Sequence, residues 1–334
     1  MRVICIDLQQ TLPCPRLNNS RAYFKRKIWC YDLCIYDCNQ ELANCFIWDE
    51  TEAKRGSEEV GSCLMKWYEQ NRAAGIRKLV IFMDNCAGQN KNIYNILTVM
   101  RMIHKGDLDE VTLEFLIPGH SYLPCDAAFG VIEQKIKKQK VIGCPEHYAD
   151  VIRTATQRGN NVIKMRQSDF AATKELFSYI SLRRPRGDIK FSQGRTFKLT
   201  KAKPWIYHIE SLEGNTDVDL EKAKTGKSGK GGKAKGKSKS NDTEEATPLL
   251  STVVLNPRYT NGFLKLPDGK LTDVLSLKGF IDLRGIRWLD AVVRGQRDAV
   301  DQTGEAFDEH LVADEVNWMD EDSDYDYDTV PEPI

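Results

Sequence analysis

Four acidic side chains lie where strands are expected to end and helices to begin. Asp7 follows an alternating apolar run at the N-terminus, and Asp84 follows the apolar run "LVIFM". Glu59 lies in a segment with helical spacing, and Asp126 begins a helix after the strand "LEFLIPG". Ligands of α/β proteins gather at the carboxyl ends of strands, so one rim of a sheet could collect three of these groups.

Carboxylates gathered in this way point to a bound cation or a shared proton. Two of them about 4 Å apart repel by roughly 4 kcal/mol at an effective dielectric constant near 20. Oxygen ligands without a cysteine or histidine cluster favour Mg²⁺ or Mn²⁺ over zinc. Two such ions about 3.5–4 Å apart activate water and stabilise the leaving oxygen in phosphodiester cleavage. Cys30, Cys34 and Cys38 share one strand face without zinc-ligand spacing, which predicts core thiols.

Each acid also has an ordinary structural interpretation. Asp126 suits a helix cap, and Glu59 alone would be a surface residue of a helix. Asp7 and Asp84 could each begin a turn. The polar segment after Asp84 predicts a capped helix start that could bind a phosphate or hold Asp84 in place. Its polar and glycine residues are Asn85, Gly88, Gln89, Asn90 and Asn92.

The elements expected to position these acids follow the order βββαβαβα. Three sequential strands suit an antiparallel meander, and later strands that alternate with helices suit parallel additions. The sequence therefore predicts an α/β fold, or α+β with a mixed sheet, in which a core of five strands has flanking helices. The expected strands are residues 1–10, 22–38, 43–50, 76–85 and 111–119, and the expected helices are residues 55–71, 92–105 and a third from about Pro124.

The pattern changes after Gly143, where two further helices and two short strands are expected. The helices cover residues 145–159 and 168–184, and the strands lie within residues 187–200 and 204–211. We predict five regions: a core domain, a small accessory region, a disordered Lys/Gly-rich linker, an accessory C-terminal segment and an acidic disordered tail. These regions are residues 1–145, 146–217, 218–247, 248–295 and 296–334.

The composition excludes membrane and secreted proteins. Of the 334 residues 41% are hydrophobic, yet no apolar run approaches the roughly 20 residues that span a bilayer. The N-terminus has no secretion-signal pattern, so we expect a nuclear or cytoplasmic protein without a membrane partner. The ten cysteines are then expected to remain thiols.

A net charge of zero hides a strong separation of charge along the chain. Residues 301–334 hold 13 acidic residues and no lysine or arginine, whereas residues 1–300 hold 48 basic residues against 35 acidic ones. Eight lysines lie between Lys222 and Ser240. Blocks of this kind are typically solvated. The lysine-rich linker could also contact nucleic acid through its phosphates, or contact the acidic tail.

The order of the elements and the acids resembles the ribonuclease H-like superfamily. "FMDNCAGQNKNIYNILTVMRMI" resembles its fourth strand and following helix, and "PGHSYLPCDAAFG" resembles its histidine loop and final aspartate. The resemblance implies that the four acids hold Mg²⁺ or Mn²⁺ and that His120 assists product or proton handling. The implied metal ligands are Asp7, Glu59, Asp84 and Asp126.

A longer resemblance covers residues 1 to about 290 apart from the lysine-rich insertion. "VICIDLQQTLPCP", "WDETEAKRGSEEVGSCL", "FMDNCAGQNKN" and "FLIPGHSYLPCD" together resemble transposon-derived proteins of animal genomes that carry an uncharacterised ribonuclease H-like, DDE-type transposase domain. Members usually have cysteine-rich or DNA-binding sequence ahead of this domain. This chain starts inside the first strand, which suggests truncation or reuse of the domain without its targeting module.

One alternative concerns the last acid of the set. "FGVIEQKIKK" also resembles the active-site helix of retroviral integrases, whose glutamate is the third catalytic acid. Glu133 lies seven residues after Asp126 on the same helix face. We favour Asp126 because it lies at the strand exit, and keep Glu133 as the reserve.

Three functions follow as expectations from the resemblance. The first is a metal-dependent nuclease or strand-transfer domain that acts on DNA, with oligomerisation left open. The second is a domesticated, catalytically inactive protein that serves in nucleic-acid binding or assembly. The third is a ribonuclease H that acts on RNA–DNA hybrids.

Overall fold

Five strands form the middle of one large sheet in the computed structural model, which describes residues 1–117, 122–181, 190–221 and 248–300. The central strand β1 (Arg2–Leu8) pairs antiparallel with β4 (Ile28–Asp37), and β4 pairs antiparallel with β5 (Leu42–Asp49). On its other side β1 pairs parallel with β6 (Lys78–Met83), and β6 pairs parallel with β7 (Glu110–Phe115). A hairpin joins β4 to β5, and helices make the crossovers before β6 and β7, as parallel pairing requires.

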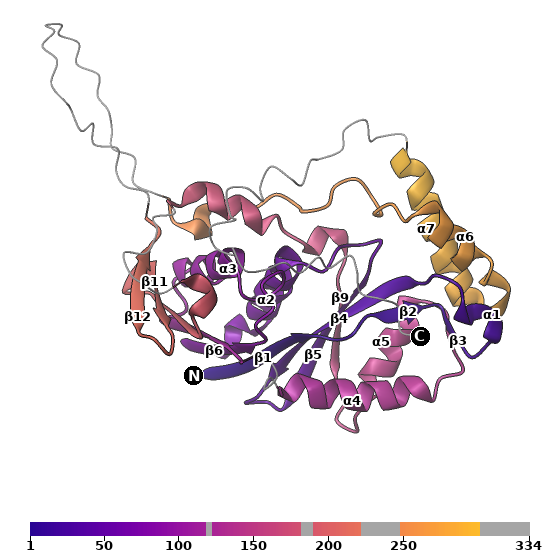
Figure 1. Ribbon diagram of the computed structural model, residues 1–334, viewed down its shortest axis with the longest axis horizontal. Helices are drawn as coiled ribbons and strands as arrows, with labels where there is room; N and C mark the ends of the chain where they lie inside the picture. The colour runs from indigo at the N-terminus through magenta and orange to yellow at the C-terminus, as the bar shows by residue number, and fades with distance from the viewer. Residues whose placement is uncertain (118–121, 182–189, 222–247, 301–334) are drawn as a thin grey trace, which may run out of the picture.

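Further strands extend this sheet to ten (Figure 1). Beyond β5 lies β9 (Asn161–Lys164), which is parallel to it, and the short β2 (Leu12–Cys14) pairs antiparallel with part of β4. Beyond β7 lie β10 (Thr196–Thr200), β11 (Lys203–Glu210) and β12 (Asn215–Asp219), all antiparallel to their neighbours. The prediction of a mixed α/β sheet with flanking helices is confirmed, but the sheet has ten strands where a core of five was expected. Two of the added strands, β10 and β11, are the short strands expected in the accessory region, and they join the main sheet. The added strands satisfy the N–H and C=O groups that β5 and β7 would otherwise leave unpaired.

Helices cover both faces of the sheet, above and below it in Figure 1. The helices α2 (Ser57–Asn71) and α3 (Ile93–His104) pack on one face, against alternate strand residues such as Ile4 and Ile6. The helices α4 (Pro124–Lys137) and α5 (Pro145–Arg153) pack on the other face, where Cys5 and its neighbours point. The period-2 alternation of each central strand thus builds two separate hydrophobic cores.

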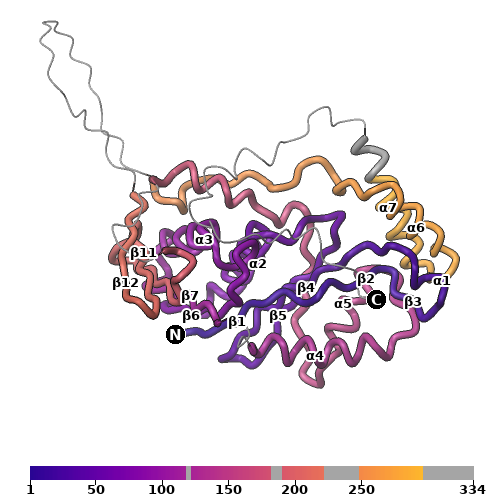
Figure 2. Tube along the Cα trace, in the orientation of Figure 1, coloured from indigo at the N-terminus to yellow at the C-terminus, as the bar shows by residue number. Residues whose placement is uncertain are grey.

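A third, smaller core joins the two ends of the described chain. In Figure 2 α1 (Ser20–Tyr23), α6 (Asp268–Leu275) and α7 (Leu283–Val300) lie together at one end of the sheet. Ile28, at the start of β4, packs with Leu289 of α7 in this core. Among the described helices none is long and apolar enough to cross a membrane. The remaining short elements are β3 (Arg16–Leu17), β8 (Val141–Ile142) and the 3₁₀ turns Arg72–Ala74, Gln167–Asp169, Thr173–Tyr179, Phe191–Gln193, Leu250–Thr252 and Lys278–Phe280.

The helix predicted over residues 168–184 is wrong for its described part. The chain there forms the 3₁₀ turns η2 (Gln167–Asp169) and η3 (Thr173–Tyr179). Between them the backbone N–H of Ala171 donates to Ser62 Oγ at 3.0 Å, and the N–H of Ala172 donates to the carbonyl of Asn256 at 2.9 Å. Donors used by distant partners cannot make the internal bonds of an α-helix, so tertiary contacts override the helical spacing.

A C-terminal strap, residues 248–262, holds the 3₁₀ segment against the core. Arg101 of α3 donates to the carbonyl of Val253 at 2.7 Å, and the N–H of Leu250 donates to Nδ1 of His104 at 2.9 Å. Arg258 Nε lies 2.8 Å from Glu58 Oε2, whose side chain is 2% exposed. This ion pair fixes the strap at the start of α2.

We expect Arg258→Met to destabilise the fold by about 2–3 kcal/mol. The change leaves the Glu58 carboxylate buried without its cation, which typically costs about 3–5 kcal/mol when both partners are fully buried. Because the side chain of Arg258 is 31% exposed, solvent reduces that cost. Urea unfolding of the parent and the variant measures the difference. Arg258→Met/Glu58→Gln should recover part of the loss, and a double variant no more stable than the single one would contradict the ion-pair explanation.

Candidate functional site

The register between β1 and β6 brings Asp7 and Asp84 to the same rim. Ile6 pairs with Met83 in this parallel ladder, so the next residue on each strand is an aspartate. Ile6 and Met83 both point into the core under α2 and α3. Strand residues alternate between faces, so Asp7 points to the opposite face, which α4 covers.

The start of α4 brings a third carboxylate to the same place. Cys125 is fully buried, and its thiol lies 3.4 Å from the carbonyl of Cys5 and 3.6 Å from that of Cys34. These contacts seat the first turn of α4 on β1 and β4, two residues before Asp7 on β1. Asp126 follows directly and accepts a hydrogen bond from the N–H of Leu123 at 2.6 Å.

The carboxylate of Asp7 interacts electrostatically with those of Asp84 and Asp126. Burial raises the pKa of Asp7, and the nearby Asp84 raises it further. The N–H of Leu8 lowers this pKa and Asp126 raises it, with a result of about 7. At neutral pH Asp7 is therefore about half protonated, because burial and the two neighbouring carboxylates oppose its ionisation. A cation or a proton would relieve that repulsion.

Each of the three aspartates uses only one carboxylate oxygen within the described residues. Oδ1 of Asp7 accepts from the N–H of Leu8 at 2.9 Å, and Oδ1 of Asp84 accepts from the N–H of Cys86 at 3.3 Å and from the Asn90 amide. Oδ2 of Asp126 makes the bond to Leu123. No described donor lies against the second oxygen of any of them, which leaves three acceptors for a ligand.

The polar segment after Asp84 is a hydrogen-bonded loop that leads into α3. The N–H of Asn90 donates to the carbonyl of Cys86 at 2.8 Å, and Asn92 caps α3 by accepting from the N–H of Asn95 at 3.0 Å. Nδ2 of Asn95 returns to the carbonyl of Asn90 at 2.9 Å. The loop thereby orients the 2% exposed Asn90, whose side chain holds Asp84.

Glu59 lies elsewhere, at the start of α2 on the opposite face of the sheet. One carboxylate oxygen accepts from the N–H of Gly56 at 2.7 Å, and the other accepts from the hydroxyl of Tyr259 in the strap. With both oxygens engaged and 2% exposure, Glu59 serves as a buried cap of α2 in this structure. No described contact joins it to the three aspartates.

The two other expected site residues stand apart from the three aspartates. His120 lies outside the described residues. Glu133 is a half-buried residue of α4, seven positions after Asp126. At 1.5 Å per residue, that separation is about 10 Å along the helix.

The donor set of the three aspartates is suited to a hard divalent cation. All three groups offer carboxylate oxygen, which Mg²⁺ and Mn²⁺ prefer. Even so, among the described residues no group of three or more His, Cys, Asp or Glu side chains is arranged to hold a metal ion. The carboxylate oxygens are suitable ligands for a divalent cation. To bind one together, the three side chains would have to rotate toward a common point.

Sequence reasoning missed a buried polar pair beside this site. Asp32 of β4 is fully buried and Gln9 is 3% exposed, and neither side chain has a nitrogen or oxygen hydrogen-bond partner among the described residues. Burial raises the pKa of Asp32 to about 7, although the Cys45 thiol opposes the rise. The carbonyl of Asp32 accepts from the N–H of Gln9 at 3.0 Å. An acid within the otherwise apolar run "WCYDLCIY" was the available signal.

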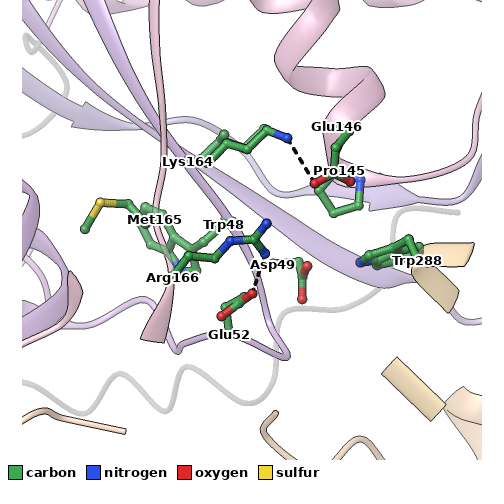
Figure 3. A pocket seen from close by; sticks show the side chains of 10 residues that line it. Trp48, Asp49, Glu52, Pro145, Glu146, Lys164, Met165, Arg166 and Trp288 are labelled. Atoms are coloured by element: carbon green, nitrogen blue, oxygen red, sulfur yellow. Dashed lines mark hydrogen bonds and ion pairs between the residues drawn. The ribbon is translucent and has the colours of Figure 1, made fainter. Parts of the chain in front are cut away.

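A small cavity between β5, β9 and α5 also gathers charged groups (Figure 3). Lys164 pairs with Glu146 at 3.1 Å, and Arg166 pairs with Glu52 at 2.7 Å. Burial raises the pKa of the nearby Asp49 to about 6, and the hydroxyl and N–H of Thr51 partly oppose this. The cavity measures about 20 Å³, room for about one water molecule, so it is too small for a substrate.

One family model matches the chain over residues 35–204, and its description is a domain of unknown function, DUF7869. The chain belongs to the DUF7869 family. The matched DUF7869 segment includes Glu59, Asp84 and Asp126, whereas Asp7 on β1 precedes it. Comparison with curated proteins and with solved structures gave no match.

We expect Asp7→Asn to change how the stability of the metal-free protein depends on pH. With a folded pKa near 7 against an ordinary 3.8, Asp7 favours folding below about pH 4, and this contribution is lost as the pH rises through 7. Asparagine does not titrate, so this pH-dependent loss is absent from the variant. From pH 5 to pH 8 the free energy of unfolding of the variant, relative to that of the parent, should rise by about 1–2 kcal/mol after allowance for solvent screening. Urea unfolding in EDTA at both pH values measures this, and parallel pH profiles would contradict it.

Proposed function

We propose that this DUF7869 protein has a ribonuclease H-like core that acts as a metal-dependent nuclease or strand-transfer domain on DNA phosphodiesters. The observation that carries the proposal is the meeting of Asp7, Asp84 and Asp126 at the rim where β1 and β6 end. A group of mutually repelling, half-buried carboxylates of this kind is a feature of functional sites.

The strand order supports the same proposal. In the middle of the sheet the order is β5, β4, β1, β6 and β7, with β4 as the antiparallel member. A three-strand meander followed by two parallel strands, with helices in the crossovers, is the arrangement that the resemblance to the ribonuclease H-like superfamily implies. The resemblance to transposon-derived proteins makes DNA the favoured substrate class.

Each residue of the site then has a definite task. Asp7, Asp84 and Asp126 would hold Mg²⁺ or Mn²⁺ through their second oxygens. When bound, two such ions supply an activated water and stabilisation of the leaving oxygen. Asn90 engages one oxygen of Asp84, which leaves the other for the ion. Leu123 does the same for Asp126 through its backbone N–H.

The position of Glu59 supports a second candidate function. The resemblance implies that this glutamate is a metal ligand, yet Gly56 and Tyr259 engage both its oxygens. A domesticated protein that keeps the fold while its acid set is dispersed would show this arrangement. Such a protein would bind nucleic acid or support an assembly without cleavage.

Nicking of supercoiled plasmid DNA in Mg²⁺ or Mn²⁺ separates the two functions. We expect the parent to nick and Asp84→Asn to lose more than about 100-fold of the rate, since even groups that only orient a metal ligand contribute about 10–100-fold. Asn90→Ala should lose about 10–100-fold for that reason. Mg²⁺ should raise the melting temperature of the parent more than that of Asp84→Asn. A parent without metal-dependent nicking and without a Mg²⁺ shift would favour the inactive protein.

Asp126→Asn and Glu133→Gln distinguish the two assignments of the last acid. If Asp126 is a ligand, Asp126→Asn should fold nearly normally, lose more than about 100-fold of the nicking rate and bind Mn²⁺ more weakly. If Asp126 only caps α4, the variant should lose about 1 kcal/mol of stability and keep its activity per folded molecule. Glu133→Gln is the matched control and should be nearly silent. Abolished nicking in Glu133→Gln alone would establish the integrase-like assignment.

A further inference from the structure

A large open groove lies at the opposite end of β4 from the hairpin that joins β4 to β5. Its volume is about 1070 Å³, and its walls come from the β2–β3 segment, α1 and the chain that leads into β4, with Lys270 of α6 at one side. Figure 2 shows α1 and α6 meeting at this end of the molecule. The candidate metal site makes no contribution to the walls of this groove.

The groove carries aromatic rings that the fold does not bury. Tyr23 is 70% exposed and Phe24 is 87% exposed, and their ring centroids lie 4.9 Å apart in an edge-to-face arrangement. Trp29, half-buried, adds a third ring to the wall, with Lys270 Nζ 5.7 Å from its centroid. Neighbouring exposed aromatic side chains are unusual on a surface with no binding role.

The same groove is positively charged. Five cationic side chains line it, and described carboxylates pair with three of them: Asp273 with Lys25 and Arg26, and Glu50 with Lys270. The two other cations have no carboxylate within ion-pair distance among the described residues and contact backbone carbonyls instead: Lys27 contacts that of Lys25 at 2.5 Å, and Arg16 contacts those of Ile136 and Gln139 at 3.2 Å.

We propose that this groove binds a single strand of nucleic acid. Exposed aromatic rings stack on unpaired bases, and cations along the same groove contact the phosphates. A base-paired duplex keeps its bases stacked within itself and would leave Tyr23 and Phe24 unused. An apolar peptide would use the rings but not the cations.

Binding of a single strand in this groove would add substrate binding to the proposed function, and it does not depend on cleavage activity. Along β4, Asp7 lies opposite Cys34, whereas Cys14, beside the groove, lies opposite Ile28. Six strand residues span about 20 Å at 3.3 Å per residue. A strand bound in the groove would therefore lie within a few nucleotides of the three aspartates, where it could hold substrate for them.

The binding test compares two fluorescein-labelled 15-mers, oligothymidine and an abasic strand with the same phosphates. Fluorescence anisotropy of the full chain is measured in EDTA at low salt, so cleavage cannot contribute. Phosphate contacts by the lysines of residues 222–240 affect both probes equally, which leaves their affinity ratio as a measure of stacking. We expect the parent to prefer oligothymidine by at least about tenfold, the effect of one stacked base.

Tyr23→Ala/Phe24→Ala should reduce this preference to near onefold, with the affinity for the abasic strand and the melting temperature nearly unchanged. Leu212→Ala removes a 79% exposed side chain from the β11–β12 turn and should keep the full preference. Arg16→Gln removes a groove cation that has no carboxylate partner among the described residues, and it should lower the salt slope for oligothymidine by about 0.7, the value of one contact to a single strand.

An unchanged preference in Tyr23→Ala/Phe24→Ala would overturn the proposal, as would equal affinity of the parent for both probes. A parent that binds neither probe would also overturn it, in favour of a groove occupied by the chain's own acidic residues 301–334. Loss of nicking in Asp84→Asn bears only on the proposed cleavage, so the two proposals fail separately.

Discussion

The parallel register of β1 on β6 is the constraint on which the candidate site depends. Because Ile6 pairs with Met83, each of two neighbouring strands ends in an aspartate on the face that α4 covers. Burial and the neighbouring charge hold the pKa of Asp7 near 7, so ionisation of Asp7 at neutral pH lowers the stability of the folded protein. The apolar residues on the other face of the same strands, including Ile4 and Ile6, supply the stability that offsets it.

Packing then determines which acids share that environment. Cys125 fits against the backbone of β1 and β4, and this contact holds Asp126 beside Asp7. Glu59, also a carboxylate close to a helix start, lies across the sheet, where the Tyr259 hydroxyl and the N–H of Gly56 donate to its two oxygens. Residues of one chemical type thus take different roles because the fold gives them different partners.

The described C-terminal segments complete the structure in two ways. The strap, residues 248–262, places Arg258 against the buried carboxylate of Glu58 and so ties itself to α2. The helices α6 and α7 build a separate core around Ile28, and Asp273 of α6 holds Arg26 at the edge of the aromatic groove. The groove is therefore formed by segments almost 250 residues apart in the sequence.

The sequence by itself determined the central strands, the helices α2, α3 and α4, and the identity of acids at strand ends, because periodicity and capping act over a few neighbouring residues. For the segment after Asp84 it predicted a capped helix start that could bind a phosphate or hold this aspartate, and the Asn90 amide holds it. Only the tertiary structure decided that Asp84 and Asp126 lie beside Asp7 while Glu59 does not, because register and packing join residues far apart in the chain. The same reason explains why β10 and β11, expected as accessory strands, extend the main sheet together with β9 and β12. It also explains the 3₁₀ turns near Ala171, whose hydrogen-bond partners lie on distant segments.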